Sequence, residues 1–410
     1  MEMMKCKLGD IAKTGSGGTP KSTVAEYYEN GNIPWINSGE LNNPFISTTS
    51  NFITQKGYDN SSAKLFPPRT VLLAMYGATA GKASLLEFEA CTNQAICAIM
   101  PNQDVLLPRF LKYKLDTMYN YLVGLSTGSA RDNLSQDAIK ALELCIPPLS
   151  EQKKIASILS ALDDKIALNK KMNQKLERMA KRLYDYWFVQ YDFPNKNGHP
   201  YKTTGGPMTY NPTLKREIPV GWEVNVVGNV CETVLGGTPS TENERFWNGN
   251  IPWLNSGEVA EFPILNAEKS ITEDAVKNSA TAYLPAGSVT LSITRHLRPS
   301  IMAIDACINQ SVAGIKENDI LKNGYLYPYL VNEIPRLNTL RGGAQQPHIN
   351  KDTVDKSPIV LPSQNVLHQY YEKVNPLYNE IIEKAKESQK LTTLRDKLLP
   401  LLMNGQVTIK

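Results

Sequence analysis

Short apolar runs recur along the chain, and each is bounded by glycine, proline or polar residues. Four examples are TVLLAMYG (70–77), AICAIM (95–100), SVTLSI (288–293) and SVAGI (311–315). Runs of this length and composition are typical of strands. In LPRFLKYKLDTMYNYL (107–122) the apolar residues instead follow the spacing of a helix. The pattern therefore predicts an α/β fold of the mixed α+β kind.

Two longer segments have a different periodicity. Apolar residues in 149–190 and 363–403 alternate between spacings of three and four, which predicts two long helices with coiled-coil seams. The first seam comprises Ile155, Ile158, Leu162, Met172, Leu176, Met179, Leu183 and Tyr186. The second seam comprises Leu367, Tyr370, Val374, Leu377, Ile381, Leu391, Leu398 and Leu402. Pro376 is expected to kink or interrupt the second helix, because proline lacks an amide hydrogen.

The chain contains an internal repeat. NIPWINSGE (32–40) and NIPWLNSGE (250–258) differ at one position, and KLGDIAKTGSGGTP (7–20) aligns in the same order with VVGNVCETVLGGTP (226–239). A spacing of about half the chain predicts two copies of one domain rather than a solenoid, whose units are much shorter. The predicted order is a first domain (1–148), a long helix (149–190), a linker (191–219), a second domain (220–362), a long helix (363–403) and a tail (404–410).

The repeated motifs also predict local structure. Each GGTP sequence predicts a turn, because glycine adopts positive φ at little cost and proline fixes the backbone that follows. Trp35 and Trp253, which follow a proline in each copy, are expected to fill a small core.

Composition agrees with a soluble globular protein. The 410 residues are 41% hydrophobic and 20% charged, with a net charge of +4. No segment is apolar enough to span a membrane, and the first ten residues lack the apolar core of a secretory signal, so we expect a cytoplasmic protein. The six cysteines form no CxxC pair and are expected to be reduced core residues.

The usual motifs of catalysis are missing from the sequence. It contains no GxxxxGK[ST] loop, HExxH helix or spaced Cys/His set. YGATAGK (76–82) lacks the Lys-Ser/Thr ending of a phosphate loop, and NNPF (42–45) lacks the second proline expected of an amine methyltransferase. We therefore expect no metal, no cofactor and no catalytic residue in this chain.

The whole chain resembles the specificity subunit of type I restriction-modification systems. The resemblance rests on the order of domains and helices, on GGTP, NIPW and SGE in each copy, and on IPPLSEQKKI (146–155) at the start of the first helix. The second helix lacks the PPLSEQ motif of the first, because it begins LPSQNVLHQY (361–370).

The resemblance implies a fold and a set of partners. It implies two target-recognition domains, each reading one half of a bipartite, asymmetric double-stranded DNA target, joined by two antiparallel helices. The helices would dock two methylation subunits of an adenine-N6 DNA methyltransferase, and restriction (nuclease-translocase) subunits would join the full complex. S-adenosylmethionine, ATP and Mg²⁺ would belong to those partners.

Charge modifies this expectation. Residues 1–150 contain 13 Lys and Arg against 13 Asp and Glu, and residues 216–362 contain 12 against 16. A protein that binds duplex DNA alone usually presents a strongly basic face, because phosphate contacts supply most of the affinity. We therefore expect this chain to read bases while its partners supply much of the phosphate contact.

Two glycine-containing stretches in each copy offer side chains for base reading, which requires Arg, Lys, Asn, Gln or hydroxyl groups on accessible loops. The candidates in the first copy are Thr19, Lys21, Ser22, Arg131 and Asn133. Those in the second copy are Thr238, Ser240, Gln345, Gln346, His348 and Asn350. Because GGTP and NSGE are shared by domains that should read different half-sites, a structural turn or phosphate contact is favoured over base reading for both.

A specificity determinant should differ between the copies. MYGATAGKAS (75–84) in the first copy is replaced by ITRHLRPS (293–300) in the second. The candidates here are Tyr76, Thr79 and Lys82 in the first copy and Arg295, His296 and Arg298 in the second. For any one of these arginines, an exposed residue without function is the alternative.

Two other functions are compatible with the sequence. One is a self-sufficient DNA-modifying enzyme whose site has diverged, and the other is a two-headed scaffold without DNA specificity. Binding of S-adenosylmethionine by the isolated chain would favour the first, and equal affinity of the assembled complex for all DNA sequences would favour the second.

Overall fold

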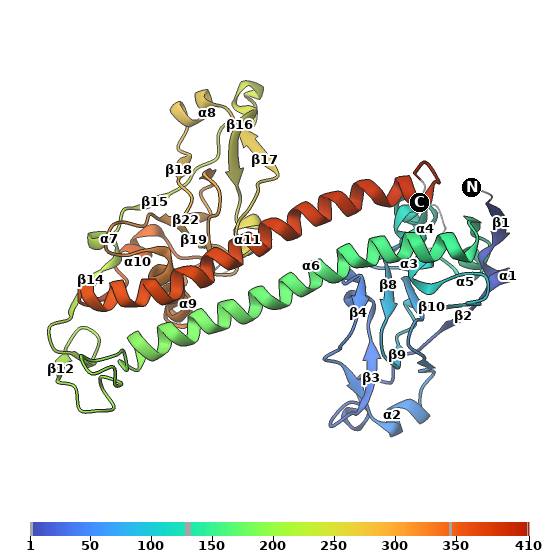
Figure 1. Cartoon of the computed structure of the whole chain (residues 1–410), viewed down its shortest axis with the longest axis horizontal. Helices are drawn as coiled ribbons and strands as arrows, with labels where there is room; N and C mark the ends of the chain where they lie inside the picture. Colours follow the sequence, from blue (N-terminus) through green and yellow to red (C-terminus); the bar gives the residue numbers. More distant parts are fainter. Residues whose placement is uncertain (1–2, 128–132, 344–346, 408, 410) are drawn as a thin grey trace. The chain divides into compact units, whose positions relative to one another are not determined.

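The computed structural model describes residues 3–127, 133–343, 347–407 and 409. The chain divides into two compact units, one of residues 1–166 with 390–410 and the other of residues 167–389. Each unit contains one copy of the repeat and one half of each long helix (Figure 1). The first unit therefore consists of the two ends of the chain.

The first copy is built from short strands and helices. In chain order these are β1 (Met4–Lys7), α1 (Leu8–Ile11), β2 (Ala12–Ser16), β3 (Ile33–Ile36), β4 (Phe45–Ile46), β5 (Phe52–Ile53), α2 (Gln55–Asp59), β6 (Leu65–Phe66), β7 (Val71–Ala74), β8 (Ala83–Leu86), β9 (Ala90–Thr92), β10 (Ile96–Pro101), α3 (Pro108–Thr117), α4 (Tyr119–Thr127), α5 (Gln136–Lys140) and β11 (Glu143–Ile146). Short 3₁₀ turns lie at Ala25–Tyr27 and Ser38–Asn42. The predicted strands and helix of this copy are confirmed.

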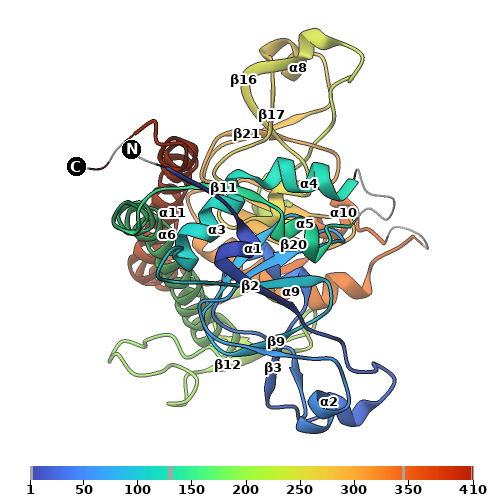
Figure 2. The same cartoon turned by 90° about the vertical axis from the view of Figure 1, so that its right-hand side faces the viewer.

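Two sheets organise the first copy. One has the strand order β2-β10-β7-β8-β4, and the other has the order β5-β3-β9-β6 with β3 parallel to β9. The side chains of β7 alternate: Val71 and Leu73 enter the core that contains α3, whereas Leu72 and Ala74 enter a second core on the opposite face. Both faces of this sheet are thus covered, which explains why β7 reads as a continuous apolar run. Figure 2 shows β3, β9 and α2 at the end of the copy away from α6.

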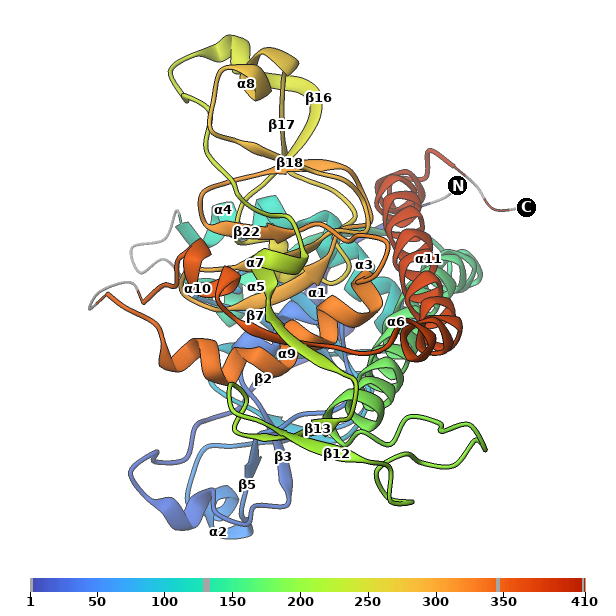
Figure 3. The same ribbon diagram turned by 90° about the vertical axis from the view of Figure 1, so that its left-hand side faces the viewer.

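The second copy repeats this plan. Its elements are β14 (Glu223–Val226), α7 (Val227–Val230), β15 (Thr233–Leu235), β16 (Trp247–Leu254), β17 (Lys269–Ile271), α8 (Glu273–Lys277), β18 (Ala282–Leu284), β19 (Val289–Ser292), β20 (Arg298–Ile301), β21 (Ala306–Ile308), β22 (Val312–Ile315), α9 (Asn323–Thr339), α10 (Lys351–Asp355) and β23 (Pro358–Leu361). The sheets β15-β22-β19-β20 and β17-β16-β21-β18 correspond to those of the first copy, and β16 is parallel to β21. Figure 3 shows β16 and β17 beside α8. The predicted duplication is confirmed.

The two long helices are α6 (Leu149–Tyr184), which continues as a π-helix over Asp185–Val189, and α11 (Gln364–Met403). In the second unit they run antiparallel, because Asn169 donates to Glu387 (2.8 Å) while Asn173 donates to the carbonyl of Ile381 (3.0 Å). Pro376 does not interrupt α11, so the expected break is wrong.

The predicted seam of α6 is wrong at two positions. Met179 and Tyr186 are 55% and 39% exposed, whereas their neighbours Ala180 and Trp187 are buried. The reason is that the small Ala180 makes the contact with the core of the second unit, a position that a search for large apolar residues passes over. Leu176 and Leu183 do pack against this core.

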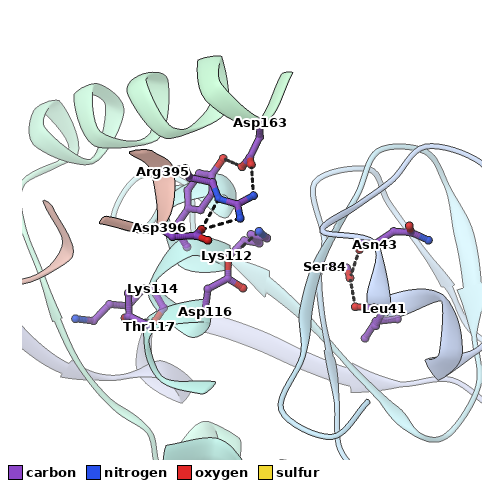
Figure 4. Close-up of polar contacts among 11 residues, drawn as sticks. Leu41, Asn43, Ser84, Lys112, Lys114, Asp116, Thr117, Asp163, Arg395 and Asp396 are labelled. Atoms are coloured by element: carbon purple, nitrogen blue, oxygen red, sulfur yellow. Dashed lines mark hydrogen bonds and ion pairs between the residues drawn. The ribbon is translucent and has the colours of Figure 1, made fainter. Parts of the chain in front are cut away.

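In the first unit the helices are joined by a partly buried ion pair. Arg395 of α11 donates to Asp163 of α6 at 2.8 Å, and Tyr113 of α3 donates to the other oxygen of the same carboxylate at 2.5 Å. Figure 4 shows Arg395 between Asp163 and Asp396. Burial, and then the hydrogen bond to Asp163, raise the pKa of Tyr113, so this hydroxyl stays a donor. Loss of Arg395 would leave the buried carboxylate of Asp163 without its cation, so the three residues hold α11 to the first copy.

Residues 191–219, predicted as a linker, contain a hairpin of β12 (Met208–Asn211) and β13 (Arg216–Pro219). Tyr191, Phe193 and Ile218 are buried in the core of the second unit. Phe193 stacks on Trp222, with ring centroids 4.9 Å apart. The segment is thus part of the second unit's packing.

The expected positive φ of the GGTP glycines is wrong. Gly17, Gly18, Gly236 and Gly237 are buried and do not adopt positive φ. They are required for a different reason, close approach to neighbouring backbone. A Cβ on Gly17 would lie 1.9 Å from the carbonyl oxygen of Thr92, and a Cβ on Gly236 would lie 2.0 Å from that of Ile308.

We expect Gly17→Ala and Gly236→Ala to destabilise their respective units. The added methyl group overlaps backbone that cannot move away, at a cost of about 3 kcal/mol or more. For units of this size that corresponds to a fall of roughly 6–12 °C in melting temperature, measurable by calorimetry. The control is Gly124→Ala, because a Cβ there meets nothing within 4 Å. A melting temperature for Gly17→Ala equal to that of the control would contradict the steric explanation.

Candidate DNA interface

The GGTP motif docks on the Asn-Gln sequence at the end of a neighbouring strand in each copy. Thr19 Oγ1 donates to Gln94 Oε1 at 2.6 Å, and Thr238 makes the same bond to Gln310. The indole of Trp35 donates to the carbonyl of Gly18 (3.0 Å), as that of Trp253 does to Gly237 (3.2 Å). The motif therefore has an internal structural role in both domains.

The NSGE motif has an internal role as well. Asn37 Oδ1 accepts from the Gly39 amide at 2.9 Å, and the Asn37 amide donates to Glu40 at 3.2 Å. Asn255 makes the equivalent contacts with Gly257 and Glu258 at 2.7 and 2.8 Å. The motifs GGTP and NSGE, which the two copies share, thus make the same internal contacts in both domains. We call these contacts the framework of each domain; they agree with the interpretation of these motifs as structural turns.

The remaining candidates near GGTP lie on the surface of that framework. The side chains of Lys21 and Ser22 in the first copy and of Ser240 in the second are exposed, as are those of Thr19 and Thr238. The two threonines reach solvent while bonded to a glutamine, whereas the other three are on the loop that follows. These five residues are accessible to a ligand.

In the first copy the loop Met75–Lys82 joins β7 to β8 and differs most from its counterpart. Thr79, predicted to contact DNA, is 4% exposed and donates to the carbonyl of Ser38 at 2.9 Å. It anchors the loop to the NSGE turn and does not present a side chain at the surface. Lys82 donates to Asn42 at 2.5 Å, and Tyr76 is half-buried against the core.

In the second copy the corresponding loop, Ile293–Leu297, is three residues shorter. It presents Arg295 and His296, and Arg298 follows at the start of β20; all three are exposed. Arg295 adopts a left-handed conformation with φ of 53°. The loop and the start of β20 thus present three exposed side chains, two arginines and one histidine.

In each copy the structure brings the loop that differs between the copies (75–82 or 293–297) next to the second glycine-containing stretch. In the second copy the amide of Ile349 donates to the carbonyl of Ile293 at 3.1 Å, and Thr294 pairs with His348. In the first copy the amide of Leu134 donates to the carbonyl of Met75 at 2.9 Å. Residues that are far apart in sequence thus form one loop cluster in each domain, and Asn133 and His348 are exposed at equivalent places within it.

Arg341 is the residue that the sequence analysis missed. Its guanidinium donates to the carbonyl of Arg295 and to that of Pro347 (2.7 Å), so it ties the two halves of the cluster together. The first copy has Ser126 at the aligned position, buried and bonded to Val123 at 2.8 Å. The replacement of Ser126 by Arg341 between the copies was a signal that the sequence offered. Its meaning depends on the contact between the two loops, which the sequence does not show.

Asn350 has a different position from that expected of a base-reading residue. Its side chain is the N-cap of α10 and accepts from the amide of Thr353 at 2.9 Å, as Ser135 does for α5. Arg131, Gln345 and Gln346 lie outside the described residues.

The electrostatics of the second cluster favour an anionic ligand. Arg295, Arg298 and Arg341 have no ion-pair partner among the residues described, although residues 216–362 carry more acidic than basic side chains. Guanidinium groups that are not engaged in an ion pair can donate hydrogen bonds to guanine edges and to phosphates.

Other chemistry is not supported by the described part of the chain. No group of three or more His, Cys, Asp or Glu side chains there is arranged to hold a metal ion. The six cysteines are free, and burial raises the pKa of Cys91 to about 11 and that of Cys97 to about 12, so neither thiol is a nucleophile near neutral pH. Among the described helices, none combines the length and the apolar character that crossing a bilayer requires.

Comparison with known proteins agrees with this geometry. The chain is 29% identical over 98% of its length to the type I restriction enzyme MjaIX specificity subunit of Methanocaldococcus jannaschii, 93% of which is covered. It is 23% identical over 92% of its length to the HindI specificity subunit of Haemophilus influenzae, 94% of which is covered. The fold resembles the crystal structure of a type I restriction-modification S subunit from M. genitalium (TM-score 0.60, 14% identity, 98% and 96% coverage).

The family described as type I restriction modification DNA specificity domain matches residues 1–178 and 219–393, and so matches each copy separately. The chain belongs to this family and contains its DNA specificity domain twice.

Proposed function

We propose that the chain is the specificity subunit of a type I restriction-modification complex, which binds a bipartite, asymmetric double-stranded DNA target and directs methylation and restriction subunits to it. The observation that carries this proposal is that each copy separates its structural residues from its exposed, variable residues. Residues shared by the copies are engaged in the framework, whereas the loops that differ most converge on an exposed cluster. Two domains with one framework and different loops are suited to reading two different half-sites.

In the second domain Arg295 and Arg298 are the groups proposed to contact bases, with His296 and His348 beside them. Arginine forms paired hydrogen bonds with the O6 and N7 of guanine, and each such pair contributes about 1–3 kcal/mol of discrimination. In the first domain Tyr76, Lys82 and Asn133 occupy the equivalent cluster. Among the residues that the structure describes it has fewer cations, so the two domains should favour different bases.

The partners are part of the proposal. Neither copy is basic overall, so the phosphate contacts that stabilise binding come largely from two methylation subunits. Restriction subunits complete the complex. The chain itself has no catalytic role, and S-adenosylmethionine, ATP and Mg²⁺ bind to the partners.

Two rival functions make different predictions. A diverged DNA-modifying enzyme would bind S-adenosylmethionine as the isolated chain. A scaffold without specificity would give a complex that methylates DNA at no defined sequence. Mapping methylated adenines in a strain that contains the chain and its partners separates the three, because only the proposed function gives one bipartite motif.

Arg295→Asn with Arg298→Ala is expected to relax the second half-site and leave the first unchanged. Asparagine tolerates the left-handed conformation of residue 295, so the change removes a guanidinium without straining the loop. Loss of one paired contact should reduce discrimination at one base pair about 5–150-fold, by the energies given above. The measurement is long-read sequencing of methylated DNA, with the exposed Lys356→Ala as control. A change in the first half-site would contradict the assignment of one domain to each half.

Arg341→Lys should weaken discrimination at the second half-site while leaving non-specific affinity nearly unchanged. Lysine keeps the positive charge but cannot donate to two carbonyls in the fixed fork of a guanidinium. Binding titrations of the assembled complex with specific and random duplexes give the ratio, and Ser126→Ala in the first domain is the control. Equal loss of affinity for both duplexes would show that Arg341 acts only as a phosphate contact.

A further inference from the structure

A groove of about 330 Å³ lies in the first unit, between the start of α6 and the sheet of the first copy. Its buried wall is apolar and includes Leu85 and Ala156. Three cations line it as well, and they come from three elements: Arg69 precedes β7, Arg109 is in α3 and Lys153 is in α6. A groove of this size and lining suits a small molecule.

The positive charge of the groove is largely uncompensated. Arg69 and Lys153 are exposed, and neither forms an ion pair within the described part of the chain. Arg109 is partly exposed and has only distant partners, Glu87 at 3.9 Å and Asp164 at 3.6 Å. Among the described residues that line the groove, none is acidic.

Arg69 occupies a turn that favours glycine. Its φ is 70°, a conformation that disfavours residues with a Cβ. The second copy has Gly287 at the equivalent place, with φ of 91°. The two turns are otherwise alike, because the amide of Arg69 donates to Leu86 (2.7 Å) and that of Gly287 donates to Met302 (2.8 Å). Folding of the turn does not require an arginine, and a strained residue of this kind indicates a function.

The second unit places a carboxylate of its own beside this turn. Glu317 accepts a hydrogen bond from the amide of Asn323 at 3.0 Å, at the start of α9. A Cβ on Gly287 would lie 2.8 Å from the other oxygen of the same carboxylate. The second unit thus holds an internal anion at the place where the first unit has Arg69 and a cationic groove.

The second unit also fills the space. α3 and α9 begin 215 positions apart, as do α6 and α11, so Ala156 aligns with Tyr371. The hydroxyl of Tyr371 accepts from the amide of Lys322 at 2.9 Å. In the first unit the equivalent amide, that of Leu107, donates to Gln152 at 2.9 Å. Tyr371 therefore reaches from α11 across the space that the small Ala156 leaves open.

We propose that the groove of the first unit binds a small organic anion, a phosphate or carboxylate carried by an apolar or aromatic body. The anionic group pairs with Arg69 and Lys153, and the body lies on Leu85 and Ala156. The site is separate from the loop cluster, because Arg69 and the loop Met75–Lys82 are at opposite ends of β7. It does not depend on the function proposed above.

The chemistry favours a small anion over duplex DNA. Guanidinium groups pair with phosphates and carboxylates alike, so the cations alone fit either ligand. A DNA backbone, however, is bound through its phosphates and gains little from an apolar wall. A ligand with both an anionic group and an apolar body uses both parts of the groove.

The experiment titrates the full chain with four probes: naphthyl phosphate, naphthoate, naphthol and inorganic phosphate. Calorimetry is expected to show one naphthyl anion bound per chain, about tenfold or more tighter than naphthol or inorganic phosphate, because each of these lacks one half of the ligand. The tighter of the two naphthyl anions identifies the preferred anionic group.

Arg69→Gly with Lys153→Gln should weaken binding of the naphthyl anions about tenfold or more, because both free cations are lost. Its melting temperature should not fall, since glycine already occupies the equivalent turn of the second copy. The control is Lys154→Gln, an exposed neighbour on α6 that does not line the groove. Ala156→Tyr copies the second unit and should abolish binding; if it does not fold, the double variant still decides.

Three results would overturn the inference. The first is binding of neither naphthyl anion, or equal binding by the double variant and the unaltered chain. The second is inorganic phosphate binding as tightly as the naphthyl anions, which would mean an adventitious ion only. The third is a double variant that loses affinity for duplex DNA while the unaltered chain binds no naphthyl anion, which would assign the cations to the DNA backbone. The proposed function is tested by the methylation maps and not by these titrations.

Discussion

The close approach of a glycine to a strand end is the contact on which the rest of each domain depends. With no side chain at Gly17, the backbone of GGTP lies against the carbonyl of Thr92, and from there one hydrogen bond leads to the next. Thr19 reaches Gln94, and Trp35 reaches Gly18. The chain continues from Trp35 into the NSGE turn, and Thr79 anchors the loop Met75–Lys82 to that turn. A single steric condition thus positions a loop about sixty residues away in the chain.

This arrangement separates what must stay constant from what is free to vary. The framework bonds are made within GGTP, NSGE and the Asn-Gln strand ends, and they are the same in both copies. The variable loops close over the framework with different lengths and different charges. In the second domain a cluster of arginines lies on a domain with excess acidic residues, so attraction for DNA is concentrated at one place instead of being spread over the surface.

Much of the architecture was predictable because it depends on periodicity and repetition. The duplication, the strands and both long helices follow from patterns that tertiary contacts do not override. Met179 was misplaced because Leu, Met and Ala are judged by size in a sequence, whereas the helix contact at Ala180 is decided by the distance available. The φ of Gly17 was mispredicted because glycine serves both turns and close contacts, and spacing alone does not separate the two. Arg341 was missed because its function depends on two loops meeting, which only the folded chain shows.

The partly buried pair of Asp163 and Arg395 joins residues 232 positions apart, and Leu402 and Met403 complete the core in which Ile155 and Leu159 are buried. During synthesis the first unit therefore begins to emerge early but obtains Leu402 and Met403 only after residues 167–389 have been made. The second unit, residues 167–389, has left the ribosome by then. The domain that is made first is thus the last to be completed, and until then the apolar face of α6 that Leu402 and Met403 will cover remains open to solvent and chaperones.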